Sequence, residues 1–102
     1  MKYISTDTLY FETTPDNKPT AFVEPGEEIQ IQTQMNKGPW INNHPDKDKL
    51  NKRITGPNPV SGAIYIHGAK PGDMLTVHIK NIDLDNIGFT EFKRDNDLIP
   101  NW

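Results

Sequence analysis

Three histidines and one nearby carboxylate are the residues of this chain whose types and spacing could support chemistry. His44 lies in the run NNHPD, two residues before Asp46. A loop histidine near a carboxylate can act as a general base or as a metal ligand. We therefore take His44 and Asp46 as candidate catalytic residues. The alternative interpretation is an ordinary solvent-exposed loop.

His67 and His78 flank a Pro-Gly turn, in the run HGAKPGDMLTVH. If the two flanking segments pair as a hairpin, the two imidazoles could approach one another as zinc ligands do. His44, His67 and His78 are therefore the candidate metal ligands. The competing interpretation places His67 at the end of one strand and His78 on the polar face of the next, with no metal.

Other familiar catalytic arrangements have no basis in this sequence. The chain has no cysteine, so a thiol nucleophile, a disulfide framework and a cysteine-based zinc site are excluded. No serine lies on a recognisable strained turn, and no glycine-rich phosphate loop is present. Trp40, in the run GPW, could line a pocket, but its large apolar ring favours a place capping the core.

Short β-strands are the elements expected to position these residues. Nine prolines and seven glycines punctuate the chain, and no window of helical length shows a 3.6-residue period. Helices should therefore be a minor component. The expected strands are residues 2–5, 9–13, 20–24, 28–34, 62–68 and 74–84, the last being the longest.

Turn signals separate these strands. Residues 15–19 combine proline, aspartate and asparagine, and Pro25-Gly26 suits a type II turn because glycine accepts a positive φ. A second Pro-Gly turn lies within residues 69–73. In residues 74–84 the apolar side chains Leu75, Val77 and Ile79 alternate with polar ones, which is typical of a strand with one wet face.

Two stretches lack this regularity. Residues 35–59 show no strand pattern, and long irregular stretches of this kind are usually functional or covered by a partner. Within them, the basic run KDKLNKR at residues 47–53 is expected to be a solvated loop. The tail, residues 85–102, is expected to form a final strand and an arm that docks elsewhere.

Composition places the chain among soluble proteins of one domain. Its 102 residues suit a single β domain, and its net charge of −3 comes from interspersed acidic and basic residues. Without a basic face, nucleic-acid binding is not expected. No apolar run is long enough for a signal peptide or a membrane span, so we expect a cytoplasmic protein that does not bind membranes.

One ordered block carries a family resemblance. The segment NPVSGAIYIHGAKPGDMLTVHIKNIDL, together with the earlier VEPGEEIQIQTQMNKGPW, resembles the acetamidase/formamidase family. Ala63 departs from a proline that is common in the family at that position. The residues that match the family pattern are Asn58, Pro59, Ser61, Gly62, Tyr65, Gly68, Ala69, Pro71, Gly72, Asp73 and Leu75.

The resemblance implies an amidohydrolase that converts small linear amides such as formamide and acetamide to the carboxylate and ammonia. It implies a jelly-roll-like β-sandwich, an all-β fold of which this chain supplies the N-terminal portion. The complete enzyme would use zinc or another divalent metal, and the chain would act as a fragment or subunit. Its partners would be a missing C-terminal portion or partner chain, or further copies in a homo-oligomer.

Two other interpretations stay open. The chain could be a non-catalytic β-sandwich module that binds a ligand or serves assembly. It could also be a complete small enzyme that uses His44, Asp46 and a metal across an oligomer.

Overall fold

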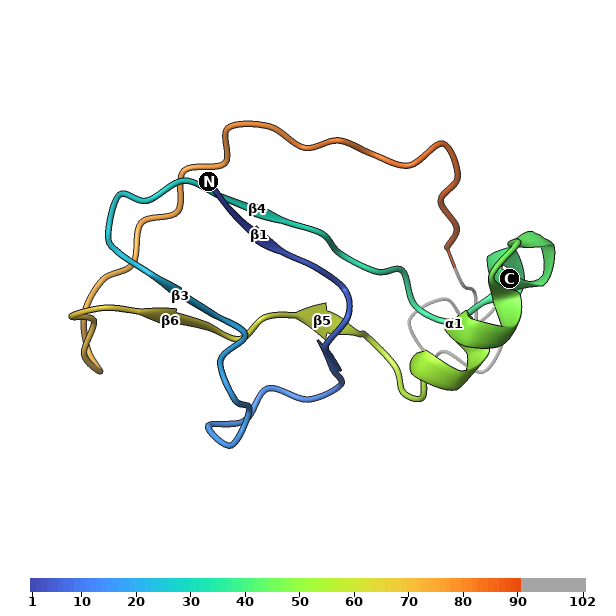
Figure 1. The fold of residues 1–102 in the computed structure, drawn as a ribbon, viewed down its shortest axis with the longest axis horizontal. Helices are drawn as coiled ribbons and strands as arrows, with labels where there is room; N and C mark the ends of the chain where they lie inside the picture. Colours follow the sequence, from blue (N-terminus) through green and yellow to red (C-terminus); the bar gives the residue numbers. More distant parts are fainter. Residues whose placement is uncertain (91–102) are drawn as a thin grey trace, which may run out of the picture.

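Short strands and coil make up most of the chain in the computed structural model, which describes residues 1–90 (Figure 1). Helix is a small part of it, as the all-β prediction requires. In chain order the elements are β1 (Lys2–Ile4), β2 (Leu9–Tyr10), β3 (Ala21–Val23), β4 (Ile29–Ile31), the 3-10 helix η1 (Pro39–Asn43), α1 (Lys47–Arg53), β5 (Val60–Ser61) and β6 (Ile64–Ile66).

The strands pair over long sequence distances into three two-stranded sheets within residues 1–90. β1 pairs in parallel with β4, and β3 pairs in parallel with β6. β2 pairs with β5 in antiparallel fashion. Parallel pairing needs a long crossover rather than a tight turn, so the Pro-Gly turns do not join paired strands. Figure 1 shows β3 and β6 side by side, with the chain leaving β6 toward the turn that follows it.

The strand predicted for residues 74–84 is wrong. These residues belong to a segment, residues 74–87, that has no ladder partner in the described part of the chain and passes outside β4 (Figure 1). We call it the outlying segment. Its alternating side chains satisfy the local requirement for a strand, but a strand also needs a neighbour to accept its backbone hydrogen bonds. The final strand expected in the tail is not formed in residues 85–90, and residues 91–102 lie outside the described residues.

The turns themselves are confirmed. Gly26 has a φ of 85°, and the Glu27 N–H donates to the Glu24 carbonyl at 3.0 Å. The second Pro-Gly turn closes in the same way, with Gly72 at a φ of 91°. Both glycines occupy backbone conformations that side chains with a Cβ rarely adopt, which explains the residue type at each position.

The loop predicted for residues 47–53 is also wrong, because they form helix α1. A helix of seven residues is too short to show a helical period, and only one of its side chains, Leu50, is buried. Leu50 packs with Ile41 of η1 and with Ile54, whose side chain is fully buried. Burial of Leu50 therefore stabilises this short helix, whose intrinsic helix propensity alone would not keep it folded. Trp40 packs against the same cluster, which confirms its expected place at the core.

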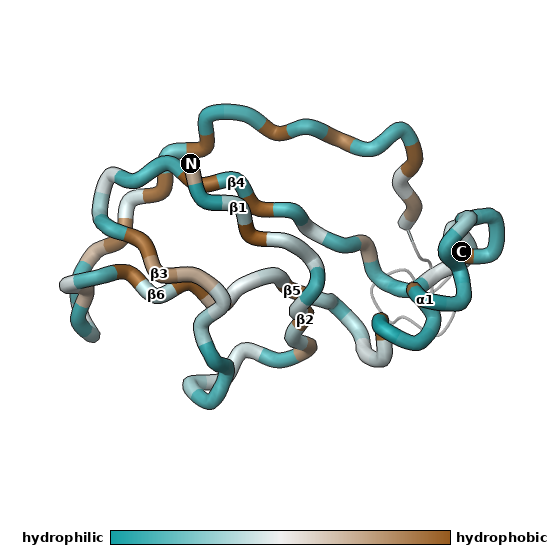
Figure 2. Tube along the Cα trace, in the orientation of Figure 1, coloured by the Kyte–Doolittle hydropathy of each residue, from teal (hydrophilic) through white to brown (hydrophobic). Residues whose placement is uncertain are grey.

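More large apolar side chains are exposed than buried in residues 1–90. Figure 2 shows hydrophobic positions spread along the outlying segment. A substantial apolar surface is thus left open. No helix in the described part of the chain is long and apolar enough to cross a membrane.

Candidate functional site

His44 lies at the junction between η1 and α1, half-buried against Trp40. Its backbone N–H donates to the Ile41 carbonyl at 3.0 Å, ending η1. Its ring meets the Trp40 ring edge-on, with centroids 5.8 Å apart. Its Nδ1 accepts a hydrogen bond from the backbone N–H of Asp46 at 3.1 Å. The imidazole is therefore held on one side by the Trp40 ring and on the other by the backbone N–H of Asp46, the residue that precedes α1.

This hydrogen bond determines what the His44 ring can do. A neutral imidazole that accepts through Nδ1 carries its proton on Nε2. A metal-bound histidine has the reverse arrangement, with one nitrogen on the metal and the other donating its N–H. The neutral His44 ring is thus arranged to donate a hydrogen bond through Nε2 rather than to ligate a metal there. A role as a hydrogen-bond donor fits this geometry better than a ligand role.

Asp46 is the residue immediately before α1 and is exposed. Its side chain makes no capping hydrogen bond to the helix, and its contact with His44 is through its backbone N–H. The two candidate catalytic residues are therefore neighbours, but their side chains are not joined as a base and its orienting carboxylate.

His67 follows β6 and lies in an aromatic cluster. Its ring centroid is 5.4 Å from that of Tyr65 and 6.2 Å from that of Phe22. Its Nε2 is 4.0 Å from a Glu24 carboxylate oxygen, at the outer limit of an ion pair. Phe22 and Tyr65 are register partners in β3 and β6, so the parallel pairing builds this cluster.

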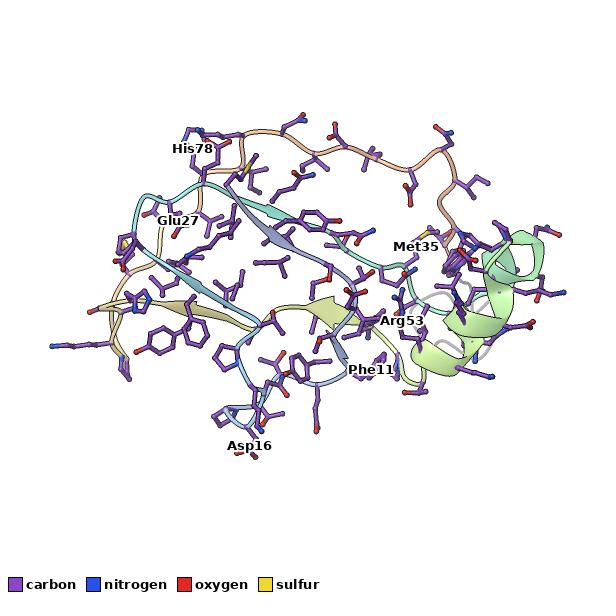
Figure 3. All side chains as sticks on the ribbon, viewed as in Figure 1. Phe11, Asp16, Glu27, Met35, Arg53 and His78 are labelled. Carbon is purple, nitrogen blue, oxygen red and sulfur yellow. The ribbon has the colours of Figure 1, made fainter. Side chains whose placement is uncertain are left out.

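His78 lies on the outlying segment, well separated from Arg53 and Phe11 (Figure 3). It is exposed, and no hydrogen bond, ion pair or ring contact joins it to His44 or His67 in residues 1–90. The described residues contain no group of three or more histidine, aspartate or glutamate side chains that could hold a metal ion. The three candidate ligands thus lie on three separate elements.

A polar cluster around Arg53 was not predicted from the sequence. The Arg53 guanidinium donates to Gln34 Oε1 at 3.1 Å and lies 3.5 Å from Thr6 Oγ1. Thr6 is 5% exposed, and its N–H donates to Gln32 Oε1 at 3.3 Å. Every partner of the cation here is neutral, and the Arg53 Nε is buried without a hydrogen-bond partner among the described residues.

The sequence does indicate the orientation of the two glutamines of this cluster. Gln32 and Gln34 alternate with apolar residues, which assigned them to one face of the strand at residues 28–34. Nothing local to Arg53 or Thr6 indicates that they meet this face, because 47 residues separate them along the chain.

A second polar contact fixes the loop that begins the family-like block. The side chains of Asn36 and Asn58 bond reciprocally: Asn36 Nδ2 donates to Asn58 Oδ1 at 3.0 Å, and the Asn58 N–H donates to Asn36 Oδ1. Asn58 has a φ of 52°, a conformation that asparagine tolerates better than most residues. Beside this pair is an open hollow of about 270 Å³, lined by Asn36, Lys37, Ile54, Thr55, Gly56 and Pro57.

Two surface carboxyls have lowered pKa values. The backbone N–H of Glu24 and then the Lys2 ammonium hold the pKa of Glu27 below its ordinary 4.5. The Lys80 ammonium, 2.9 Å from the Glu28 carboxylate, lowers the pKa of Glu28. Both carboxyls accept hydrogen bonds in their charged form, which favours ionisation. Both belong to the link between β3 and β4 and are remote from α1, so this effect is structural.

Comparison with known proteins gives one family. No curated protein and no solved structure matches the chain significantly. The profile of the Acetamidase/Formamidase family, in contrast, matches residues 6–98, which include the Arg53 cluster, the Asn36–Asn58 pair and all three histidines. A match over most of the chain, with the block at residues 58–84 inside it, is decisive: the chain belongs to the acetamidase/formamidase family.

Proposed function

We propose that this chain is a fragment or subunit of an amidohydrolase that, when complete, hydrolyses small linear amides to the carboxylate and ammonia. The observation that carries the proposal is the family match over residues 6–98. The complete assembly would close the jelly-roll-like sandwich that the family resemblance implies, in the cytoplasm, with a further C-terminal portion or partner chain covering the open apolar surface.

Amide hydrolysis sets clear requirements for such an assembly. Water adds to the carbonyl carbon, the carbonyl oxygen becomes an oxyanion, and the C–N bond breaks as the nitrogen takes a proton. His44 offers a donor through Nε2 because its Nδ1 is already engaged. That geometry supports a role in donating a hydrogen bond to the oxyanion.

A divalent metal such as zinc remains part of the proposal for the complete enzyme only. The described residues do not themselves fit a zinc site, since their histidines lie on separate elements and His44 Nδ1 is an acceptor. When bound, a metal would activate the water or polarise the carbonyl. We assign no step to it and none of His44, His67 or His78 as its ligand.

A chimera tests the proposal. Residues 6–98 would replace the corresponding portion of an active family enzyme, and ammonia release from formamide and acetamide would be measured. We expect turnover, and we expect His44→Ala in the chimera to reduce kcat at least tenfold, in line with the loss of one hydrogen-bond donor to the oxyanion. His78→Ala, at an exposed position on the outlying segment, is the matched control and should leave kcat unchanged.

The second candidate, a non-catalytic β-sandwich module, is favoured by the structural uses of two histidines. His44 accepts a hydrogen bond from the backbone N–H of Asp46, and His67 packs against two rings. A chimera that folds by circular dichroism but releases no ammonia, with the parent enzyme active, would establish this candidate and reject the first. Ammonia release by the isolated chain with added zinc would instead show that 102 residues suffice.

A further inference from the structure

The Arg53 guanidinium lies between α1 and the segments that follow β1 and β4 (Figure 3), and its partners there are neutral. Its Nη2 donates to Gln34 Oε1 at 3.1 Å and to Thr6 Oγ1 at 3.5 Å. No carboxylate lies within ion-pair distance of Arg53 among residues 1–90, where the ion pairs join other residues. A partly buried cation is usually paired with an anion. Within the described residues, the charge of Arg53 is thus uncompensated.

The polar side-chain groups that are still available in this cluster are donors. Gln32 Oε1 accepts from the Tyr3 hydroxyl at 3.0 Å and from the Thr6 N–H at 3.3 Å, and Gln34 Oε1 accepts from Arg53. A guanidinium and a backbone N–H can only donate, so these contacts fix the orientation of both amides. The Nε2 groups of the two glutamines and Arg53 Nη1 have no hydrogen-bond partner in the described part of the chain. The cluster therefore lacks an acceptor.

The cluster is open to a small ligand on one side. Gln32 is exposed, Gln34 and Arg53 are half-buried, and Thr6 is only 5% exposed. An incoming acceptor would therefore meet the glutamine amides and the guanidinium rather than the Thr6 hydroxyl. A single positive charge suits a monoanion better than a phosphate, and a planar guanidinium with amide donors beside it suits a carboxylate.

We propose that Arg53, Gln32 and Gln34 bind the carboxylate group of a small monocarboxylate such as formate or acetate. A carboxylate only accepts hydrogen bonds, and its two oxygens provide enough positions for Nη1 and both amides. The same chemistry could come from a free acid or from a carboxylate side chain elsewhere in the complete assembly. This inference does not depend on the proposed amidase activity.

Sodium acetate is the probe for a binding measurement by NMR on the chain of 102 residues. The chain has two arginines, so the Nε–H cross-peak that is lost in Arg53→Lys identifies Arg53. We expect acetate to shift this cross-peak and the Gln34 amide peaks saturably, with a dissociation constant of roughly 1 to 10 mM for one charge-assisted contact. Acetamide, which is neutral, and sodium chloride at the same ionic strength should act at least tenfold more weakly. Equal shifts with acetate and chloride would overturn the proposal.

Gln34→Glu supplies the carboxylate from within the chain. The substitution is nearly isosteric and places the negative charge where Arg53 Nη2 already makes contact, so folding should be retained. Because Arg53 is then neutralised, the affinity for acetate should fall at least tenfold. Gln30→Glu is the matched control, since Gln30 is exposed in β4 and makes no hydrogen bond to Arg53, and it should change the affinity less than twofold. Acetate binding that is unaltered in Gln34→Glu would contradict the proposal.

The source of the carboxylate is identified in the chimera that carries residues 6–98. If a free acid is the occupant, acetate should raise the Tm of the chimera but not that of its Gln34→Glu variant. If a side chain of the complete assembly is the occupant, acetate should have no effect. Gln34→Glu should then lower the Tm of the chimera but not that of the isolated chain, because two carboxylates compete for one cation only in the assembly. A chimera whose Tm responds to neither acetate nor Gln34→Glu would overturn the proposal.

Discussion

Asn58, at the start of the family-like block, adopts a left-handed backbone conformation and contacts Asn36, one of the residues that line the hollow. Its φ of 52° is held by the reciprocal amide contact with Asn36. The residue therefore does two things at once: it accepts a left-handed backbone, and it supplies both an N–H and an amide oxygen to one partner. Few residue types combine these properties.

We expect substitutions at Asn58 to separate the two contributions. Asn58→Gly keeps the left-handed conformation and loses the side-chain contact, so it should lower the free energy of unfolding by less than about 1 kcal/mol. Asn58→Ala loses both and should lower it by about 1 to 3 kcal/mol. Urea unfolding at pH 7 measures the difference. An alanine variant as stable as the glycine variant would show that the backbone conformation is not the constraint.

The outlying segment is joined to the link between β3 and β4 by an ion pair between Lys80 and Glu28. Lys80 reaches Glu28 from 52 residues away. Both side chains are largely exposed, at 63% and 55%, so solvent screens the pair. Its measurable signature is therefore the titration of Glu28 rather than a large effect on stability.

The pH dependence follows from the direction of that shift. The pKa of Glu28 is lower in the folded chain than its ordinary 4.5, so its contribution to stability is present above that value and lost as the pH falls through the folded pKa. We expect Lys80→Met to raise the pKa of Glu28 back toward 4.5 in an NMR titration. Lys2→Met is the matched control, because it removes a partner of Glu27 instead. Identical Glu28 titrations in the original chain and in Lys80→Met would contradict the assignment.

Local patterns in the sequence predicted the turns and the positions of β1 to β4 and β6, because proline, glycine and alternation act within a few residues. They did not predict β5, whose two residues lie before the strand expected at 62–68. They did not predict that β3 pairs in parallel with β6, since nothing in either strand specifies a partner 43 residues away. They also wrongly predicted a strand at residues 74–84, where apolar and polar side chains alternate but no neighbouring strand is present among the described residues.

The candidate site was predicted less completely. His44 and Asp46 do lie side by side, as their spacing required, but the contact between them is a backbone one. Arg53 was assigned to a solvated loop and instead reaches Thr6 and Gln34. Its role depends on how α1 packs through Leu50 and Ile54, which becomes visible only when the helix is in place.

The molecule as a whole combines a small helical core at one end with apolar side chains that are open to solvent along the outlying segment. Ile41, Leu50 and Ile54 are buried together, while the apolar residues of the outlying segment are not. Exposed apolar surface of this kind binds hydrophobic dyes in a folded protein, as it does in partly folded states.

We therefore expect the native chain at low micromolar concentration to enhance the fluorescence of ANS. A triple variant, with serine at Leu75, Val77 and Ile79, should reduce this enhancement at least twofold. Its far-UV circular dichroism should be unchanged, since all three side chains are mostly exposed. Unaltered dye binding would place the accessible apolar surface elsewhere on the molecule.

The pairing of strands that are distant in sequence also bears on how the chain reaches its fold. Lys2 pairs with Ile29, Leu9 with Ser61, and Ala21 with Ile64. The strands β1, β2 and β3 are therefore synthesised well before the strands with which they pair. Loop closure must precede every one of these contacts, and domains with such high contact order fold slowly. On the ribosome β2 and β3 would remain unpaired until residues near 60 had emerged, whereas η1 and α1 could associate locally well before β6 was complete. The helical core, rather than any sheet, is thus the natural nucleus for folding.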